Sequence, residues 1–259
     1  MPVWVQAQRT ATKTVMTTSK QNATTTYEIA GVPVKIVPQN ARTAEFLQEY
    51  AQLQGNWDEE LTVTDEQMQE EERLLPNPSE HLKEVGVLLR KMNALLLERY
   101  SGLVFHAAAM VFHGKAYLFA APSGTGKTTH LRLWQTYRPG QAWVLNGDKP
   151  LIRFESDGIW VYGGPWRGKE GLGCNDRCKL GGIYLLRRGT QNAVRTASSQ
   201  EALEGLLEAS LYPHEASQRL QLIKLLQLLY SRVPVSVLQC TMGCEAVETV
   251  ACHMEKGIM

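Results

Sequence analysis

Short apolar runs broken by polar residues characterise the N-terminal part of the chain. Residues 27–30 and 34–37 alternate between apolar and polar side chains on either side of Gly31, which predicts a hairpin or two paired strands. Residues 43–54 show helical spacing. The acidic run at 65–72 is typical of a solvated helix face or a loop, and we do not interpret it as a metal site. The pattern predicts a small unit of mixed α and β structure.

A broad apolar face marks the start of a second, longer part of the chain. The sequence Ser79-Glu80-His81 has the form of a helix start, and the apolar positions after it predict a helix that ends at Gly102. Strand-like and helix-like patterns then alternate. Strands are expected on either side of the turn His113-Gly114 and at 143–145, 151–154, 159–162, 182–186 and 233–238, and helices before Arg138-Pro139-Gly140 and at 200–208, 215–230 and 245–255.

The stretch at 121–129, A-P-S-G-T-G-K-T-T, lies between an apolar run and a helical pattern. This strand–loop–helix setting is that of a phosphate-binding P-loop, in which glycines let backbone N–H groups surround phosphate oxygens. Lys127 would bring its charge to the β- and γ-phosphates, and the Thr128 hydroxyl would bind Mg²⁺. Ala121 stands where the usual first glycine would be. The residues expected to bind a nucleoside triphosphate are Ser123, Gly124, Thr125, Gly126, Lys127, Thr128 and Thr129.

Three further positions are candidates for the chemistry of phosphoryl transfer. Asp148 ends a short apolar strand after the P-loop helix, where a carboxylate binds Mg²⁺ or acts as a base; the alternative is a turn residue. His106 lies in a strand expected beside the P-loop strand, although an isolated His in an apolar strand is more often a core residue. Lys169-Glu170 lies in a glycine-rich loop, 163–173, of the kind that closes over ligands, with an ordinary surface loop as the alternative.

Several other cationic residues lie near these motifs in the sequence. Arg177, Arg187 and Arg188 are further candidates for contacts with phosphate or substrate, although the pair Arg187-Arg188 is more simply a solvated strand end. His130 is expected on the exposed face of the first helical turn after the P-loop, with no functional role of its own.

The composition restricts the class of protein. With 27 Lys and Arg against 26 Asp and Glu the net charge is +1, and no basic stripe interleaved with aromatic residues is present, so we expect no nucleic-acid partner. No apolar run approaches the ~20 residues that span a bilayer. The N-terminus lacks the apolar core of a signal peptide. We therefore expect no membrane partner and a cytoplasmic location.

The number of cysteines favours reduced thiols over a framework of disulfide bonds. There are five, an odd number, and they include two pairs with C-x₃-C spacing, Cys174/Cys178 and Cys240/Cys244. A composite zinc site that also uses His253 is conceivable from this spacing. Because the spacing is loose and Cys240 has the position of a strand end that packs inward, buried or incidental thiols are the favoured interpretation.

Three features together resemble the kinase domain of bacterial HPr kinase/phosphorylase. They are the segment from His106-Ala107-Ala108 to the P-loop, the acidic motif Asn146-Gly147-Asp148, and the loop Gly171-Leu172-Gly173. The likeness covers residues 103–190 by motif and looks closest to HPr-kinase-related proteins of biosynthetic and peptide-modification clusters. It implies an α/β fold with a phosphoenolpyruvate carboxykinase-like mixed β-sheet, in which helices flank the P-loop core.

The resemblance and the patterns together divide the chain into three parts. Residues 1–24 show no periodicity and are expected to form a flexible N-terminal arm. Residues 25–78 are expected to form a small N-terminal α+β subdomain, and residues 79–259 an HPr-kinase-like P-loop nucleotide-binding domain.

The resemblance also implies an activity: an ATP- and Mg²⁺-dependent kinase that transfers the γ-phosphate to a hydroxyl, with serine as the first expectation, of a peptide, a small protein or a small molecule. Catalytic roles would fall to His106, Lys127, Asp148, Lys169 and Glu170, and Mg²⁺ binding to Thr128, Asp148 and Glu170. The family has two adjacent aspartates where this chain has Gly147-Asp148, so the base is either Asp148 or His106.

Two alternatives of other kinds remain. The missing second aspartate favours a nucleotide-binding regulatory or scaffold protein with weak ATPase activity and no efficient transfer. A serine phosphorylase or phosphatase is the other alternative, because the resemblance includes an enzyme that removes phosphate. A homo-oligomer is left open.

Overall fold

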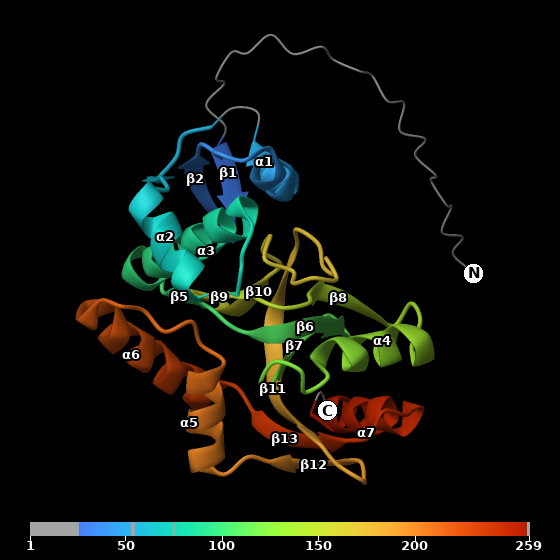
Figure 1. Ribbon diagram of the computed structural model, residues 1–259. Coiled ribbons are helices and arrows are strands. Elements are labelled where there is room, and N and C mark those ends of the chain that lie inside the picture. The colour runs from blue at the N-terminus through green and yellow to red at the C-terminus, as the bar shows by residue number, and fades with distance from the viewer. Residues whose placement is uncertain (1–25, 53–54, 75, 258–259) are drawn as a thin grey trace.

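The computed structural model describes residues 26–52, 55–74 and 76–257, and the arm expected at residues 1–24 lies outside this range. A small sheet near the N-terminus lies on top of a larger α/β body (Figure 1). The small unit contains β1 (Thr26–Ile29), β2 (Val32–Ile36), α1 (Ala41–Leu47), the 3₁₀ turn η1 (Gln48–Tyr50), β3 (Ala51–Gln52), β4 (Glu59–Leu61) and α2 (Asp65–Leu74).

The small sheet confirms the predicted hairpin and corrects the helix after it. Strands β1 and β2 pair antiparallel around a turn in which Ala30 and Gly31 both have positive φ. The order of the strands in this sheet is β3-β1-β2-β4. The helix predicted over 43–54 ends at Leu47, because the chain then turns through η1 and pairs with β1 as β3. The burial of the Tyr50 side chain, which is 2% exposed, outweighs the local helical spacing.

The acidic run does form a helix with a mostly exposed surface, α2. Glu71 departs from the expected solvated face, because it is 5% exposed. Its carboxylate accepts a hydrogen bond of 2.8 Å from Arg90 Nε, and this ion pair joins α2 to the next helix. A buried carboxylate is tolerated only when it has such a partner.

The larger body begins with the long predicted helix, α3 (Glu80–Arg99). It is capped by the Ser79 side chain, which accepts a hydrogen bond from the Leu82 N–H. Its buried face, with Leu88, Met92 and Leu96, shares one core with the small N-terminal sheet and with Trp166 of the glycine-rich loop. The boundary expected at residue 78 stays a prediction, and a continuous hydrophobic core lies across it.

The described part of the body is built on a nine-stranded mixed sheet with helices on both faces. Its strands are β5 (Gly102–Val104), β6 (Ala107–Phe112), β7 (Lys115–Ala120), β8 (Ala142–Asn146), β9 (Leu151–Glu155), β10 (Gly158–Tyr162), β11 (Arg177–Arg188), β12 (Ala193–Thr196) and β13 (Val235–Cys240). Its helices are α3 (Glu80–Arg99), α4 (Lys127–Tyr137), α5 (Ser199–Glu208), α6 (Ala216–Arg232) and α7 (Cys244–Lys256).

The long strand β11 organises this sheet. Its first residues pair antiparallel with β10, and its later residues lie between β7 and β13, parallel to both. The order is β5-β9-β10-β11-β7-β6-β8, with β13 and then β12 attached at β11. The expectation of a mixed α/β sheet is therefore confirmed.

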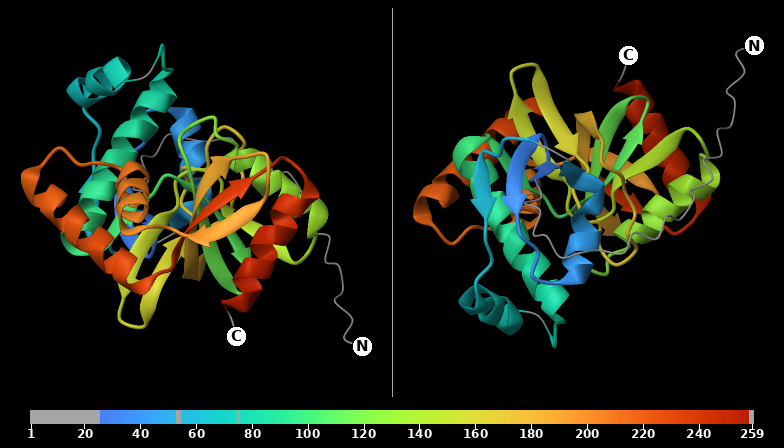
Figure 2. Two further views of the ribbon diagram at one scale, coloured as in Figure 1. Left: turned by 90° about the horizontal axis from the view of Figure 1, so that it is seen from below. Right: turned by 90° about the horizontal axis from the view of Figure 1, so that it is seen from above.

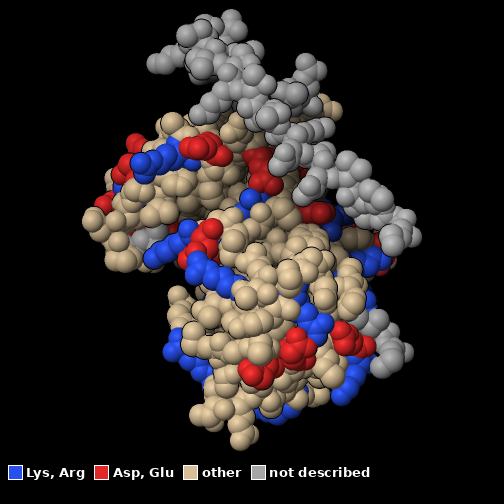
Figure 3. All heavy atoms as spheres, turned by 90° about the vertical axis from the view of Figure 1, so that its right-hand side faces the viewer, with Lys and Arg blue, Asp and Glu red and all other residues tan. Residues whose placement is uncertain are grey.

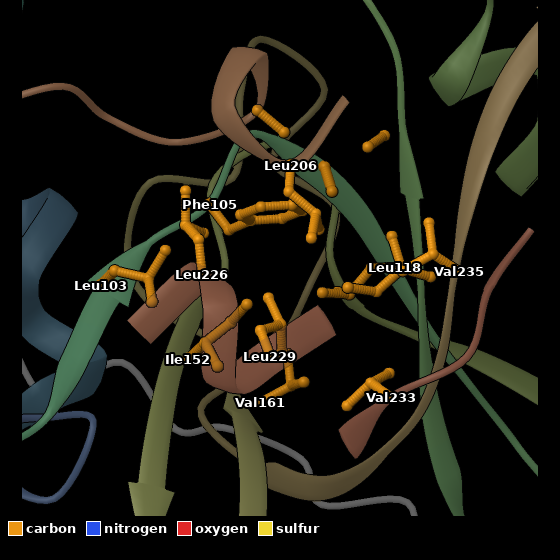
Figure 4. Close-up of a cluster of buried hydrophobic side chains, with 14 of the residues drawn as sticks. Leu103, Phe105, Leu118, Ile152, Val161, Leu206, Leu226, Leu229, Val233 and Val235 are labelled. Carbon is orange, nitrogen blue, oxygen red and sulfur yellow. The ribbon is translucent and has the colours of Figure 1, made fainter. Parts of the chain in front are cut away.

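Residues of β6 alternate between two hydrophobic cores. Ala107, Ala109 and Val111 belong to the core under α5 and α6, whereas the intervening residues belong to the core under α4 and α7. Figure 2 shows these two helix pairs on opposite sides of the sheet. In the first core Phe105 and Leu206 lie together (Figure 4), and full burial of one such side chain stabilises the fold by about 2–3 kcal/mol.

Strand β8 contains the strand predicted at 143–145. Within it Trp143 is 40% exposed, whereas Leu145 is fully buried. β8 is the last strand in the order, so a side chain there has a neighbouring strand on only one side.

Within the described residues, no helix is long and apolar enough to cross a membrane. On the face in Figure 3 acidic and basic side chains are interspersed.

The phenol of Tyr50 links the small sheet to the glycine-rich loop. Its O–H donates to the Gly163 carbonyl at 2.9 Å and accepts from Arg167 Nη2 at 2.9 Å, and burial raises its pKa to about 12. We expect Tyr50→Phe to lower the free energy of unfolding by about 1–3 kcal/mol in urea titrations, because both partners lose a buried hydrogen bond.

A matched control is Tyr230→Phe, which removes an exposed hydroxyl bound to Ser199 Oγ. Its effect should stay within about 0.5 kcal/mol. Equal effects of the two substitutions would contradict the structural role of the Tyr50 hydroxyl.

Candidate active site

The P-loop connects the end of β7 to the start of α4, as the sequence predicts. Gly124 has φ 79° and Gly126 has φ 121°, values that residues with a Cβ rarely adopt. A Cβ added at either position would meet nothing within 4 Å. The glycines are therefore required by the backbone conformation and not by crowding, and they leave open space in front of the loop.

Backbone N–H groups of the loop are left without acceptors. Among the described hydrogen bonds, none is donated by the N–H of Gly124 or by the N–H groups of residues 126–129, while the Thr125 N–H has only a long bond of 3.3 Å to the Pro122 carbonyl. The last of these groups form the N-terminus of α4, where the helix dipole is positive. Such an arrangement fits phosphate oxygens, and the residues of the P-loop therefore fit a nucleotide.

Lys127 is held against the loop by its own side chain. Its Nζ donates to the Ala121 carbonyl at 2.7 Å, and the residue is 8% exposed. Burial lowers the pKa of the Lys127 ammonium, and the nearby charge of Asp148 opposes this shift. The cation is thus fixed at the base of the loop and close enough to Asp148 to interact with it electrostatically.

Asp148 meets His106 and Lys149. His106 Nε2 lies 3.2 Å from Asp148 Oδ1, and Lys149 Nζ donates to Oδ2, so both carboxylate oxygens have a partner. Burial by itself would raise the pKa of the Asp148 carboxyl, but the hydrogen bond from His106 and the charge of Lys149 outweigh it and hold that pKa well below its ordinary value. The structure therefore brings together two of the residues that the sequence proposed separately.

The turn that carries Asp148 is fixed by Asn146, which the sequence analysis named within the acidic motif without giving it a role of its own. Asn146 is fully buried, and its Oδ1 accepts from the N–H groups of Asp148 and Lys149, both at 2.9 Å. Its Nδ2 donates to the Gly164 carbonyl at 3.0 Å. The turn-forming side chain here is therefore Asn146, and an Asn at a strand end before Gly was the signal available in the sequence.

The glycine-rich loop packs directly against this turn. The Gly147 N–H donates to the Leu172 carbonyl at 2.8 Å, and the Lys149 N–H donates to the Trp166 carbonyl at 3.1 Å. A Cβ on Gly168 would lie 2.9 Å from Asp148 Cβ. Trp166 in turn donates from Nε1 to the Val85 carbonyl of α3 at 2.8 Å. The position of Asp148 thus depends on the loop, and the loop depends on α3.

Lys169 and Glu170 are exposed residues of the same loop. The Glu170 carboxylate pairs with Arg132 of α4, a partner that the sequence analysis did not propose. This ion pair brings the loop to the P-loop helix. The expected roles of Lys169 in closing the site and of Glu170 in binding metal stay predictions.

A cleft of about 830 Å³ opens in front of the loop. His106 and the first half of the P-loop line one side, and Glu204 and Glu208 of α5 line the other. Its volume is within the range of small-molecule sites. The sequence offered no signal that α5 faces the P-loop, because its acidic residues are ordinary for an exposed helix.

His130 corrects another expectation. It is 2% exposed and not on the outer face of its helix; its ring packs on Phe119, with 4.6 Å between the ring centroids. Its Nε2 accepts a hydrogen bond of 3.1 Å from Trp134 Nε1. Burial lowers its pKa from 6.5 to about 4. His130 is therefore a core residue directly behind the P-loop.

The cysteines are free thiols in the described residues, and Cys240 is buried as expected. No group of three or more His, Cys, Asp or Glu side chains in the described range is arranged to hold a metal ion, so the composite zinc site finds no support. Mg²⁺ in a nucleotide site needs only one or two protein ligands besides phosphate oxygens. The hydroxyl of Thr128 and the carboxylate of Asp148 fit that requirement.

Comparisons with known proteins find only weak structural similarity at low sequence identity. No family model and no curated protein matches the chain. Among solved structures, the HPr(Ser) kinase/phosphatase from Coxiella burnetii matches with 11% identity and a TM-score of 0.35, over 59% of this chain and 97% of that one. At this identity and TM-score, the match carries no argument about the fold or the activity of this chain.

Burial of His130 makes the stability of the fold depend on pH. Because its pKa is lower in the folded protein, the unfolded chain takes up a proton first as the pH falls. The stability contributed by neutral His130 is complete above about pH 6.5 and is lost progressively toward pH 4. We expect the wild type to lose about 3 kcal/mol more than His130→Gln between pH 7 and pH 4 in urea titrations. Identical pH dependence in the two proteins would contradict this role.

Proposed function

We propose that the protein is an ATP- and Mg²⁺-dependent kinase that transfers the γ-phosphate to a hydroxyl group. The observation that carries the proposal is the meeting of a P-loop that has acceptor-free N–H groups with the pair His106–Asp148, next to one cleft. Phosphoryl transfer requires a phosphate cradle, a metal-binding carboxylate and a group that orients the acceptor. Each has a candidate here.

The binding roles follow from the positions of the side chains. The N–H groups of residues 124–129 and the Lys127 ammonium would hold the β- and γ-phosphates. Thr128 and Asp148 would hold Mg²⁺, which when bound neutralises charge on the phosphates. The pair formed by Glu170 with Arg132 would keep the glycine-rich loop against α4.

We assign the role of base to His106 and not to Asp148. His106 and Lys149 hold the pKa of the Asp148 carboxyl well below its ordinary value, which makes it a weak base but keeps it a charged ligand for Mg²⁺. His106 lines the cleft and directs Nε2 to Asp148, which leaves Nδ1 to take the proton of the acceptor hydroxyl. Asp148 would orient the imidazole and stabilise its charged form. This arrangement replaces the second aspartate of the family that the sequence resembles.

The acceptor would enter the cleft between the P-loop and α5. Its volume, about 830 Å³, leaves room for part of a peptide or for a small molecule. We propose a hydroxyl-bearing peptide, small protein or small molecule as the acceptor, with serine as the first candidate.

A second candidate function is a nucleotide-binding regulatory protein without efficient transfer. The ion pair between Lys149 and Asp148 favours it, because this lysine occupies the single carboxylate of the motif. The two functions share the nucleotide site. They differ in whether phosphate reaches an acceptor.

The nucleotide site is tested by Lys127→Ala. We expect binding of Mg·ATP, measured by calorimetry, to weaken roughly 100-fold or more, because a buried cation at the base of the loop is lost. Lys115→Ala is the control, since Lys115 lies exposed at the opposite end of β7. Equal affinities of Lys127→Ala and the wild type would rule out the proposed site.

The assignment of the base is tested by His106→Gln and Asp148→Asn in transfer assays with candidate acceptors. We expect each to lower kcat roughly 100- to 10,000-fold, and His106→Gln to leave the affinity for Mg·ATP within about threefold. Asp148→Asn should also raise the Mg²⁺ concentration required for binding. Undiminished transfer by His106→Gln would remove the histidine from the mechanism, and absence of transfer by the wild type from every acceptor would favour the regulatory function.

A further inference from the structure

Arg188 contacts the P-loop through two hydrogen bonds that the proposed chemistry does not use. Its Nε donates to the Thr125 carbonyl at 2.9 Å, and its Nη2 donates to the Gly124 carbonyl at 2.5 Å. A single planar guanidinium therefore holds two consecutive peptide groups. A lysine could not make this pair of hydrogen bonds in the same way, because its ammonium is a single point charge and lacks the fork of N–H groups of a guanidinium.

The main chain of Arg188 is well fixed. In β11 it lies opposite Cys240 of β13, and the Gly189 N–H donates to the Cys240 carbonyl at 3.0 Å. On the other side of β11, Leu185 pairs with Ala120, the last residue of β7 before the loop. The side chain thus extends from the end of a central strand to the loop that follows the neighbouring strand.

These contacts determine where the N–H groups of the loop point. A trans peptide is planar, so its C=O and N–H point in opposite directions. When Arg188 holds the Gly124 and Thr125 carbonyls, the N–H groups of Thr125 and Gly126 must face away from the guanidinium. Gly124 and Gly126 are glycines, the residue type with the widest backbone freedom. Without the contact to Arg188 the loop would sample more conformations and would lose more conformational entropy when it binds phosphate.

We propose that Arg188 is a positioning residue that preorganises the P-loop for the nucleotide phosphates. The inference rests on the proposed nucleotide site. Because the contact is made through the loop carbonyls, its effect depends on the fork geometry of the guanidinium. A role limited to positive charge would be shared by any cation at the same edge of the cleft.

The neighbouring residue provides a matched control. Arg187 also lines the cleft and has the same charge, but its Nη1 lies 3.1 Å from Glu201 of α5. Arg187→Ala and Arg188→Ala therefore remove equal charge from adjacent positions, and only Arg188→Ala removes the contact with the loop. Arg188→Lys keeps the charge and loses the fork.

The experiment measures the dissociation constants of Mg·ATP and Mg·ADP by calorimetry for the wild type and these variants, after circular dichroism has confirmed that each is folded. We expect Arg188→Ala and Arg188→Lys to bind both nucleotides roughly 10- to 100-fold more weakly, the factor that corresponds to losing hydrogen bonds to a charged donor. Arg187→Ala should differ from the wild type by less than about threefold. Millimolar guanidinium ion should restore part of the affinity of Arg188→Ala and none of that of Lys127→Ala.

The outcomes separate this inference from the proposed function. Wild-type affinity in Arg188→Lys, or equal losses in Arg187→Ala and Arg188→Ala, would overturn the positioning role and leave the nucleotide site intact. If the wild type binds neither nucleotide, the proposed site and this inference both fail. Weak binding by both Arg188 variants, partial recovery with guanidinium and near-normal binding by Arg187→Ala would establish the role of Arg188.

Discussion

Backbone N–H groups that have no acceptor within the protein are the constraint on which the site depends. Polar groups of this kind are normally paired, and leaving several of them together is tolerable only at a helix start that faces solvent or a ligand. In the described structure three features keep these N–H groups unpaired and in place. They are two glycines with positive φ, the contact of Lys127 with the Ala121 carbonyl, and the hydrogen bonds from the guanidinium of Arg188. The surrounding sheet keeps these groups in place.

The small N-terminal sheet takes part in the site, although it contributes none of the candidate catalytic residues. Trp166 and Arg167 connect the glycine-rich loop to α3 and to η1, and that loop supports the turn at Asp148. A shared hydrophobic core lies between the two sheets. Changes in this core would therefore reach the carboxylate through a short series of hydrogen bonds.

The environment of Asp148 explains how a site with one carboxylate differs from one with two. Lys149 and His106 occupy its two oxygens and stabilise its charged form. A carboxylate held in this way suits metal binding and the orientation of a histidine better than it suits proton abstraction. The resemblance seen in the sequence extends to the P-loop and the acidic motif, and the residue next to the aspartate departs from it.

The sequence alone determined the features that depend on neighbours along the chain. The hairpin at Gly31, the helix after Ser79 and the strand–loop–helix arrangement of the P-loop follow from local spacing, glycines and caps, and the structure has all three. Only the tertiary structure decided which residues from different strands, helices and loops contact one another. The burial of His130, the contact of Arg188 with the loop and the role of Asn146 depend on strand order and register, because residues far apart in sequence meet there and no local pattern records their distance.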